Sequence, residues 1–176
     1  MKNKAALSEY IQYVALTAMF LAASVVLSIV ENMLPPLPIP VPGVKLGLSN
    51  IPVMYTLFFL SKKRALVIAT LKSCFVVITR GLIAGFLSFS GGVLSILIMA
   101  ILLYIFKEHI SYMVLSIFGA VFHNIGQFTA ISLIFTNLYM WVYLPILLFF
   151  GIIAGFVTSV LLRFSLPALK YMKIKK

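Results

Sequence analysis

The chain has 176 residues, of which 63% are hydrophobic and only 10% are charged, and its mean hydropathy is +1.17. Soluble domains carry about 25% charged residues, and a water-soluble fold of this length cannot bury so much apolar surface. The composition therefore excludes a soluble protein and predicts an integral membrane protein. The net charge of +11 does not indicate nucleic-acid binding, because Lys and Arg gather at the ends of apolar runs, where they set topology.

Six apolar stretches, separated by charges, Pro or Gly, predict six transmembrane helices in one all-α domain that takes up residues 1–176. In chain order they run over about 10–32, 47–60, 64–86, 91–106, 111–136 and 140–166. The first contains an apolar run of about 20 residues, long enough to cross a bilayer and longer than a signal-peptide core, so we expect it to be retained. The second is short for a full crossing.

The positive charges predict the orientation of the chain, since Lys and Arg in short loops stay on the cytoplasmic side. With six spans and a cytoplasmic amino terminus, all but three of the 14 Lys and Arg residues fall in cytoplasmic segments. We therefore predict a multi-pass protein of the cell membrane with both termini in the cytoplasm. The three exceptions are Lys45, Lys72 and Arg80, which fall in an outer loop or inside a span.

The longest external connection, 32–46, reads NMLPPLPIPVPGVKL and holds five prolines, each of which fixes φ and removes a backbone donor. This Pro-rich first external loop cannot form a helix or a central strand. It is stiff and apolar and lies at the membrane surface. These properties suit either a lid over a cavity or a rigid spacer between two helices.

Lys72 and Arg80 are the charges of the third span that suggest a function. A charged side chain at the bilayer centre costs about 2.5 to 3.5 kcal/mol, so it persists where it is paired, hydrated or used. Lys72 sits about 12 Å into the span, and Thr79 and Arg80 lie on roughly the same side of the helix. A cavity on this side would attract an anion. Alternatively, Lys72 pairs with a glutamate or snorkels, and Arg80 anchors the helix at the outer interface.

The fifth span carries a polar cluster, His123, Asn124 and Gln127, in the stretch GAVFHNIGQ. Spacings of three and four residues place the three side chains on one helical face near mid-membrane. They either line a ligand pocket, where the neighbouring glycines leave room for a ligand, or hydrogen-bond to another helix as structural contacts worth about 0.6 to 2 kcal/mol.

The outer ends of the spans add a second polar set. Glu31 ends the first span within reach of Lys45 or Arg80, and a structural ion pair is its favoured role. Asn50 follows the external loop. The stretch before the fourth span provides either further outward-facing polar groups or only a turn, with Ser88, Ser90, Gly91 and Gly92.

Several of these segments occur together in one known family. They are Glu31, the Pro-rich loop, PGVKLGLSN at 42–50, SGGVLS at 90–95 and HNIGQ at 123–127. In this order, over roughly residues 10–165, they resemble the Gx transporter family, which is related to the substrate-binding S components of energy-coupling factor transporters. The same family is often labelled heptaprenyl diphosphate synthase component I.

The resemblance implies a six-helix membrane fold that captures a small nutrient or precursor from outside, with the first external loop as its lid. It also implies docking on a transmembrane T component that carries two cytoplasmic ATPases. Alanines at four-residue spacing in the first helix are a usual docking feature, and Ala18 and Ala22 match it. The chain has no GxxxxGK[ST] phosphate loop, so any ATP-driven step requires the partner ATPases.

The expected substrate is a small, anionic compound. The cations Lys45, Lys72 and Arg80 favour an anion, and nearby aromatic residues are expected to accept a ring or an isoprenoid. A vitamin-like compound, a flavin, a quinone precursor and an isoprenoid phosphate all remain open. The expected substrate-binding residues are Glu31, Lys45, Asn50, Lys72, Arg80, Ser90, His123, Asn124 and Gln127.

The main alternative is a non-catalytic membrane component of a heptaprenyl diphosphate synthase or another prenyl-lipid enzyme. A catalytic synthase subunit is not expected, because diphosphate chemistry uses magnesium held by aspartates and this chain has none. We therefore expect no enzymatic activity, no metal and no cofactor. A membrane enzyme that uses His123 as acid or base, and an assembly factor for an electron-transfer complex, are further alternatives.

Overall fold

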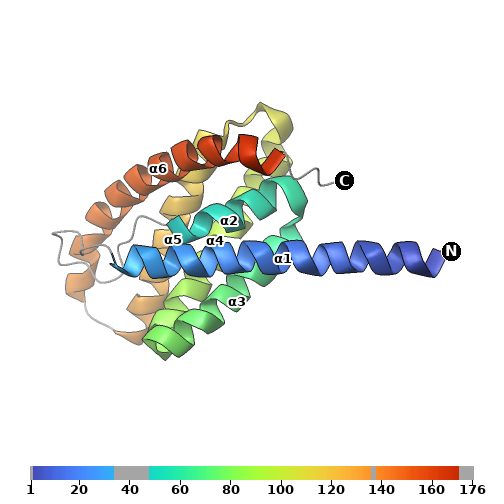
Figure 1. Ribbon diagram of the computed structural model, residues 1–176. Helices are drawn as coiled ribbons and strands as arrows, with labels where there is room; N and C mark the ends of the chain where they lie inside the picture. The colour runs from blue at the N-terminus through green and yellow to red at the C-terminus, as the bar shows by residue number, and fades with distance from the viewer. Residues whose placement is uncertain (1, 34–47, 136–137, 171–176) are drawn as a thin grey trace.

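The computed structural model describes residues 2–33, 48–135 and 138–170, and this part of the chain consists of helices joined by short connections, with no strand (Figure 1). The described residues include 3₁₀ turns at Leu48–Asn50, Lys107–His109 and Leu138–Tyr143. The α-helices are α1 (Lys2–Met33), α2 (Ile51–Tyr55), α3 (Lys62–Arg80), α4 (Leu82–Phe106), α5 (Tyr112–Ile134) and α6 (Leu144–Lys170).

Four segments are long and apolar enough to cross a membrane: Tyr10–Met33, Leu82–Phe106, Tyr112–Ile134 and Trp141–Phe164. The prediction of an all-α protein with membrane-crossing helices is confirmed to this extent. The other two predicted spans differ in kind. Leu48–Leu60 is a short apolar segment that ends in one π-helical turn, and α3 is rich in cations. The count of six spans stays a prediction.

The predicted boundary between the third and fourth spans is wrong. The chain reverses at Gly81, where φ is +90°, and α4 begins at the next residue. The SFSGG stretch at 88–92, which we expected to precede the fourth span, lies inside α4. Glycine takes a positive φ without the steric cost that a Cβ brings, so Gly81 permits a tight reversal directly after Arg80.

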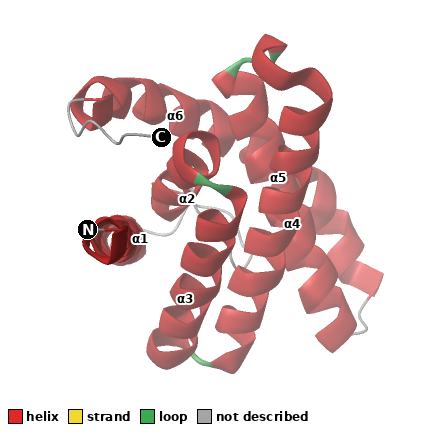
Figure 2. Ribbon diagram, turned by 90° about the vertical axis from the view of Figure 1, so that its right-hand side faces the viewer, coloured by secondary structure: helices red, strands yellow, loops and turns green. Residues whose placement is uncertain are grey.

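The helices form a layered bundle in which α3 packs against α4, α4 against α5, and α5 against α6. Helix α1 packs against α3, α2 and the Leu48–Asn50 turn. Figure 2 views α1 nearly end-on, with α2 and α3 beside it. The amino-terminal part of α1 extends past the other helices (Figure 1).

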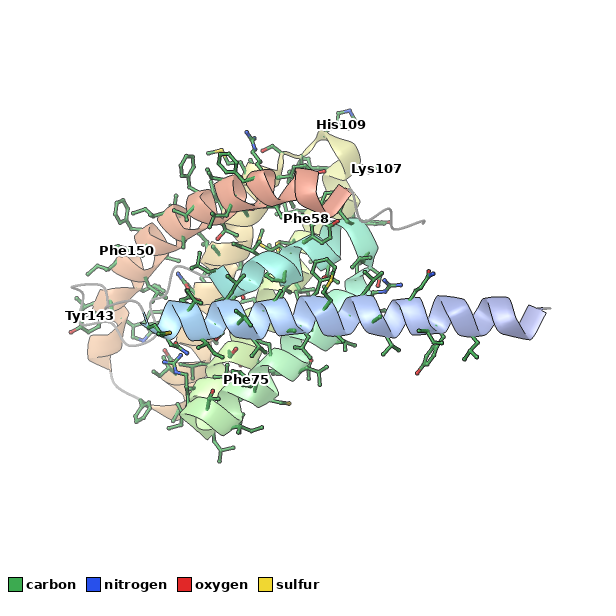
Figure 3. All side chains as sticks on the ribbon, in the orientation of Figure 1. Phe58, Phe75, Lys107, His109, Tyr143 and Phe150 are labelled. Carbon is green, nitrogen blue, oxygen red and sulfur yellow. The ribbon has the colours of Figure 1, made fainter. Side chains whose placement is uncertain are left out.

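The two ends of the bundle carry different side chains. Lys107 and His109 lie at the end toward which the amino terminus of α1 points, whereas Tyr143 lies at the opposite end (Figure 3). The amino terminus and Lys107 thus lie toward the same end of the bundle, and which side of the membrane this end faces stays a prediction. Large apolar side chains are exposed along the flanks, such as Ile78, Leu82 and Phe164, as lipid contact requires.

The tightest packing lies in one half of the bundle, which we call the closed half. Its buried cluster is Phe20, Val53, Met54, Tyr55, Leu57, Ala65, Ile68, Ala69, Ile96, Met99 and Leu162. The Phe20 ring stacks on Tyr55 at a centroid distance of 5.0 Å, and Tyr55 contacts Phe59 at 4.8 Å. These aromatic and aliphatic contacts join α1, α2 and α3.

Candidate functional site

A cavity of about 310 Å³ lies between α1, α3, α4 and α5, with further contacts from the Leu48–Asn50 turn and α6. It occupies the half of the bundle nearest the carboxyl-terminal ends of α1 and α3, which we call the cavity half. The predicted site residues that line it are Glu31, Asn50, Lys72, Arg80, His123, Asn124 and Gln127. The fold therefore brings into one cavity predicted site residues that lie up to 96 positions apart in the sequence, Glu31 and Gln127.

Lys72 provides the buried positive charge of the cavity. Its side chain is only 6% exposed, and its Nζ donates a hydrogen bond of 2.7 Å to Asn50 Oδ1. Asn50 is held there because it ends the 3₁₀ turn immediately before α2, which has Pro52 in its first turn. Arg80 follows Lys72 by eight residues, about 12 Å along the helix, and its side chain is exposed. Lys72 is thus deep in the cavity and Arg80 is at its mouth.

The α1 wall of the cavity contains Ser28 and Glu31. The Glu31 carboxylate is 7% exposed and accepts a hydrogen bond of 3.4 Å from Ser49 Oγ. Ser24 Oγ in turn donates to the Ser49 carbonyl at 2.5 Å. These bonds fasten the Leu48–Asn50 turn to α1. The expected partner Lys45 lies outside the described residues.

The polar cluster on α5 was expected either to line a ligand pocket or to bond to another helix, and its members differ in this respect. Asn124 lines the cavity and also donates from Nδ2 to the Leu147 carbonyl of α6 at 3.0 Å, so it contributes a structural bond between helices. Gln127 Nε2 lies 3.2 Å from His123 Nε2, one turn earlier on the same helix. The His123 and Gln127 side chains therefore present a joined polar surface to the cavity.

Glycines allow α4 and α5 to approach closely enough to form this wall. A Cβ on Gly91 would lie 2.7 Å from the His123 carbonyl oxygen and 2.9 Å from Gln127 Cγ. A Cβ on Gly126 would lie 2.8 Å from the Ser90 carbonyl oxygen. Such distances are shorter than real Cβ contacts, so only glycine fits at these two positions without a shift of a helix.

Comparison with known families gives one match. The model of the family described as heptaprenyl diphosphate synthase component I matches residues 20–165. The chain belongs to this family. The match confirms the resemblance described from the sequence, under the label heptaprenyl diphosphate synthase component I. No curated protein and no solved structure matches the chain.

In this member of the heptaprenyl diphosphate synthase component I family, three further predicted site residues, Ser90, Ala18 and Ala22, lie outside the cavity set. Ser90 is not among the lining residues, and its Oγ donates to the Phe86 carbonyl of its own helix at 2.9 Å. Ser88, two positions earlier and about 200° away around the helix, lines the cavity instead. Ala18 and Ala22 are exposed on α1. Their predicted docking role stays a prediction.

Sequence reasoning missed part of the lining. Ser28 and Ser49 were not singled out, although a signal for Ser28 exists: Thr17, Ser24, Ser28 and Glu31 are all buried and recur at helical spacing on α1. Nothing in the sequence marks Ala84, Ala120 and Ala154 as cavity residues. None of the described residues that line the cavity is Phe, Tyr or Trp, so the expected contact of the substrate with aromatic residues stays a prediction.

Proposed function

We propose that the chain is a substrate-binding subunit that captures a small anionic compound in this cavity and moves it across the cell membrane together with partner proteins. The observation that carries the proposal is the buried Lys72, held by Asn50 inside a cavity of about 310 Å³. The chain itself then acts as a multi-pass binding protein and not as an enzyme.

The position of Lys72 supports an anionic ligand. An ammonium group in a membrane protein is costly unless it is paired, hydrated or used. The Lys72 Nζ donates to Asn50 Oδ1, and both residues line the cavity, so the positive charge is held at the cavity wall. A phosphate or carboxylate that accepts from Lys72 would form a charge-assisted hydrogen bond, which is stronger than a neutral one. Arg80 at the mouth would attract the same anion during entry.

The surface of α1 supports a partner in the membrane. Ala18 and Ala22 are exposed and four residues apart, which lets another helix approach closely. In our proposal this surface binds the T component, and two cytoplasmic ATPases supply the energy. The family description names one component of a complex, which agrees with a partner protein.

A second candidate is a non-catalytic membrane component of a prenyl diphosphate synthase. The description of the matching family favours it. In this case the cationic cavity would hold the diphosphate of a substrate or product for a separate catalytic subunit. The two candidates predict different partners, and the same purification distinguishes them.

The experiment is purification of the tagged full chain from its own host, followed by native mass spectrometry of the complex. We expect a bound small anion and, in addition, a membrane partner with two ATPases. Lys72→Met should lower the affinity for the anion by about tenfold or more, since a hydrogen bond to a charged group contributes about 1.5 to 3 kcal/mol.

Lys63→Met is the matched control, because Lys63 is exposed at the start of the same helix and does not line the cavity. It should retain the anion. Recovery of a soluble prenyl synthase in place of the ATPases would contradict the transport proposal and favour the second candidate.

A further inference from the structure

The cavity volume limits the size of the ligand. About 310 Å³ corresponds to about ten water-sized volumes of roughly 30 Å³ each, and covalently bonded groups pack somewhat closer than separate waters. The cavity therefore has room for about ten to fifteen non-hydrogen atoms of a compound. It lies at the lower limit of the range of about 300 to 1,000 Å³ that is usual for ligand pockets.

The walls limit the shape of the ligand. Its apolar surface comes from short aliphatic side chains, including Val76, Leu87 and Ile131. No Phe, Tyr or Trp lines the described walls, so the imidazole of His123 is the only aromatic ring there and offers a small stacking surface for an extended ring system. An aliphatic segment or one small ring is what these side chains can cover.

The floor prevents a longer compound from continuing into the protein. Beyond the main cavity lies a second one of only about 10 Å³, well below the roughly 30 Å³ taken up by one water, so no part of a ligand continues into it. The two share Asn50, Lys72, Ser88 and His123 as lining residues, so the bond between Lys72 and Asn50 lies at their junction. Past the second cavity the packed cluster around Met54 and Met99 begins, which belongs to the closed half.

We infer that the ligand is a short anion of about ten to fifteen non-hydrogen atoms, with a phosphate or carboxylate group at Lys72 and a small aliphatic or single-ring remainder against Val76, Leu87 and Ile131. This inference rests on the binding role proposed above. It excludes an enclosed flavin mononucleotide, with about 31 non-hydrogen atoms, and an enclosed heptaprenyl chain, with about 35 carbons. Among the compound classes that the sequence left open, a single-ring precursor and a five-carbon isoprenoid phosphate remain.

The test compares short and long anions on the purified full chain in phosphatidylcholine nanodiscs, by isothermal titration calorimetry. The short probes are butyl phosphate, phenyl phosphate and benzoate, and the long ones are flavin mononucleotide and farnesyl phosphate. We expect at least one short probe to bind about tenfold more tightly than both long ones. Long probes that bind as tightly as the short ones would overturn the inference, while a loss of their binding in Lys72→Met would still support the proposed function.

Two cavity variants test the size limit directly. Ala120→Leu fills part of the cavity and should lower the affinity for the best short probe by about tenfold. Leu87→Ala enlarges the cavity and should reduce the difference in affinity between short and long probes. Ala15→Leu, at an exposed position of α1, is the control for added volume and should leave binding unchanged. Circular dichroism of each variant establishes that it is folded. Unchanged binding in Ala120→Leu would overturn the inference.

A lipid headgroup offers the same phosphate chemistry as a free compound. The titrations are therefore repeated in phosphatidylglycerol nanodiscs. Short-probe binding that persists there supports a free ligand, and binding that disappears there assigns the cavity to the lipid and overturns the inference. If no probe binds at millimolar concentration the inference is also overturned, and the native mass spectrometry described above then decides the proposed function separately.

Discussion

The closed half and the cavity half are built from the same three helices, α1, α3 and α4, yet one is packed and the other is open. In the closed half these helices contribute Phe20, Ile68 and Met99, all 4% exposed or less. About one to three turns away, the same helices place Ser28, Lys72 and Ser88 at the cavity. The backbone is continuous helix in both halves, so side-chain size and polarity decide where the space opens.

The difference teaches how a membrane bundle keeps a polar cavity. The hydrophobic effect contributes little to the association of helices in lipid, so their association depends on van der Waals packing and hydrogen bonds. The closed half supplies the packing. The cavity half supplies a few bonds between elements, such as Ser24 to Ser49 and Asn124 to Leu147. We therefore expect stability to depend mainly on the closed half and binding mainly on the cavity half.

The largest effect on stability is expected for Ile68→Ala. Ile68 is fully buried in the closed half, and its truncation leaves a void, which costs about 2 to 5 kcal/mol of unfolding free energy. Ile83→Ala, the matched change at a cavity residue that is 49% exposed, should cost well under half as much. Denaturation of both variants in detergent measures the difference. Equal losses would break the distinction between the two halves.

A smaller loss, of about 1 to 3 kcal/mol from overpacking, is expected for Gly91→Ala. Its Cβ would meet the His123 carbonyl and the Gln127 side chain, so the variant should lose ligand binding together with stability. Gly92→Ala is the control, because its Cβ would lie 3.5 Å from Ala69 Cβ, an ordinary contact. This control should be neutral or more stable, since Ala favours a helix over Gly by about 1 kcal/mol. A Gly91→Ala variant as stable as the control would contradict the close approach of α4 and α5.

The smallest effect is expected for Asn124→Ala, which removes the bond to the Leu147 carbonyl and should cost about 0.6 to 1.7 kcal/mol. Thr129→Ala on the same helix is the control, because Thr129 bonds only to the Ile125 carbonyl of its own helix among the interactions observed and is exposed. Thermal unfolding of the pair measures the difference. If Thr129→Ala proves the more damaging change, Asn124 has no role in joining α5 to α6.

Much of the candidate site was predictable because charge and helical spacing are local properties. Lys72 and Arg80 stand out as charges in an apolar run, and His123, Asn124 and Gln127 share a face by their spacing. Ser90 shows the limit of this reasoning. We expected residues 88–92 to precede the fourth span, whereas they lie inside α4. In this helix Ser88 lines the cavity and Ser90 does not.

The sequence by itself determined that the protein is helical and apolar enough for membranes, because composition and the length of apolar runs do not depend on how helices are arranged. Only the tertiary structure decided that Gly81 makes the reversal, that Asn50 meets Lys72, and that a small cavity results whose described walls hold no Phe, Tyr or Trp. A turn needs a permitted φ, and a cavity needs the side chains of distant helices to leave a volume unfilled. Both are properties of packing in three dimensions, which no local pattern contains.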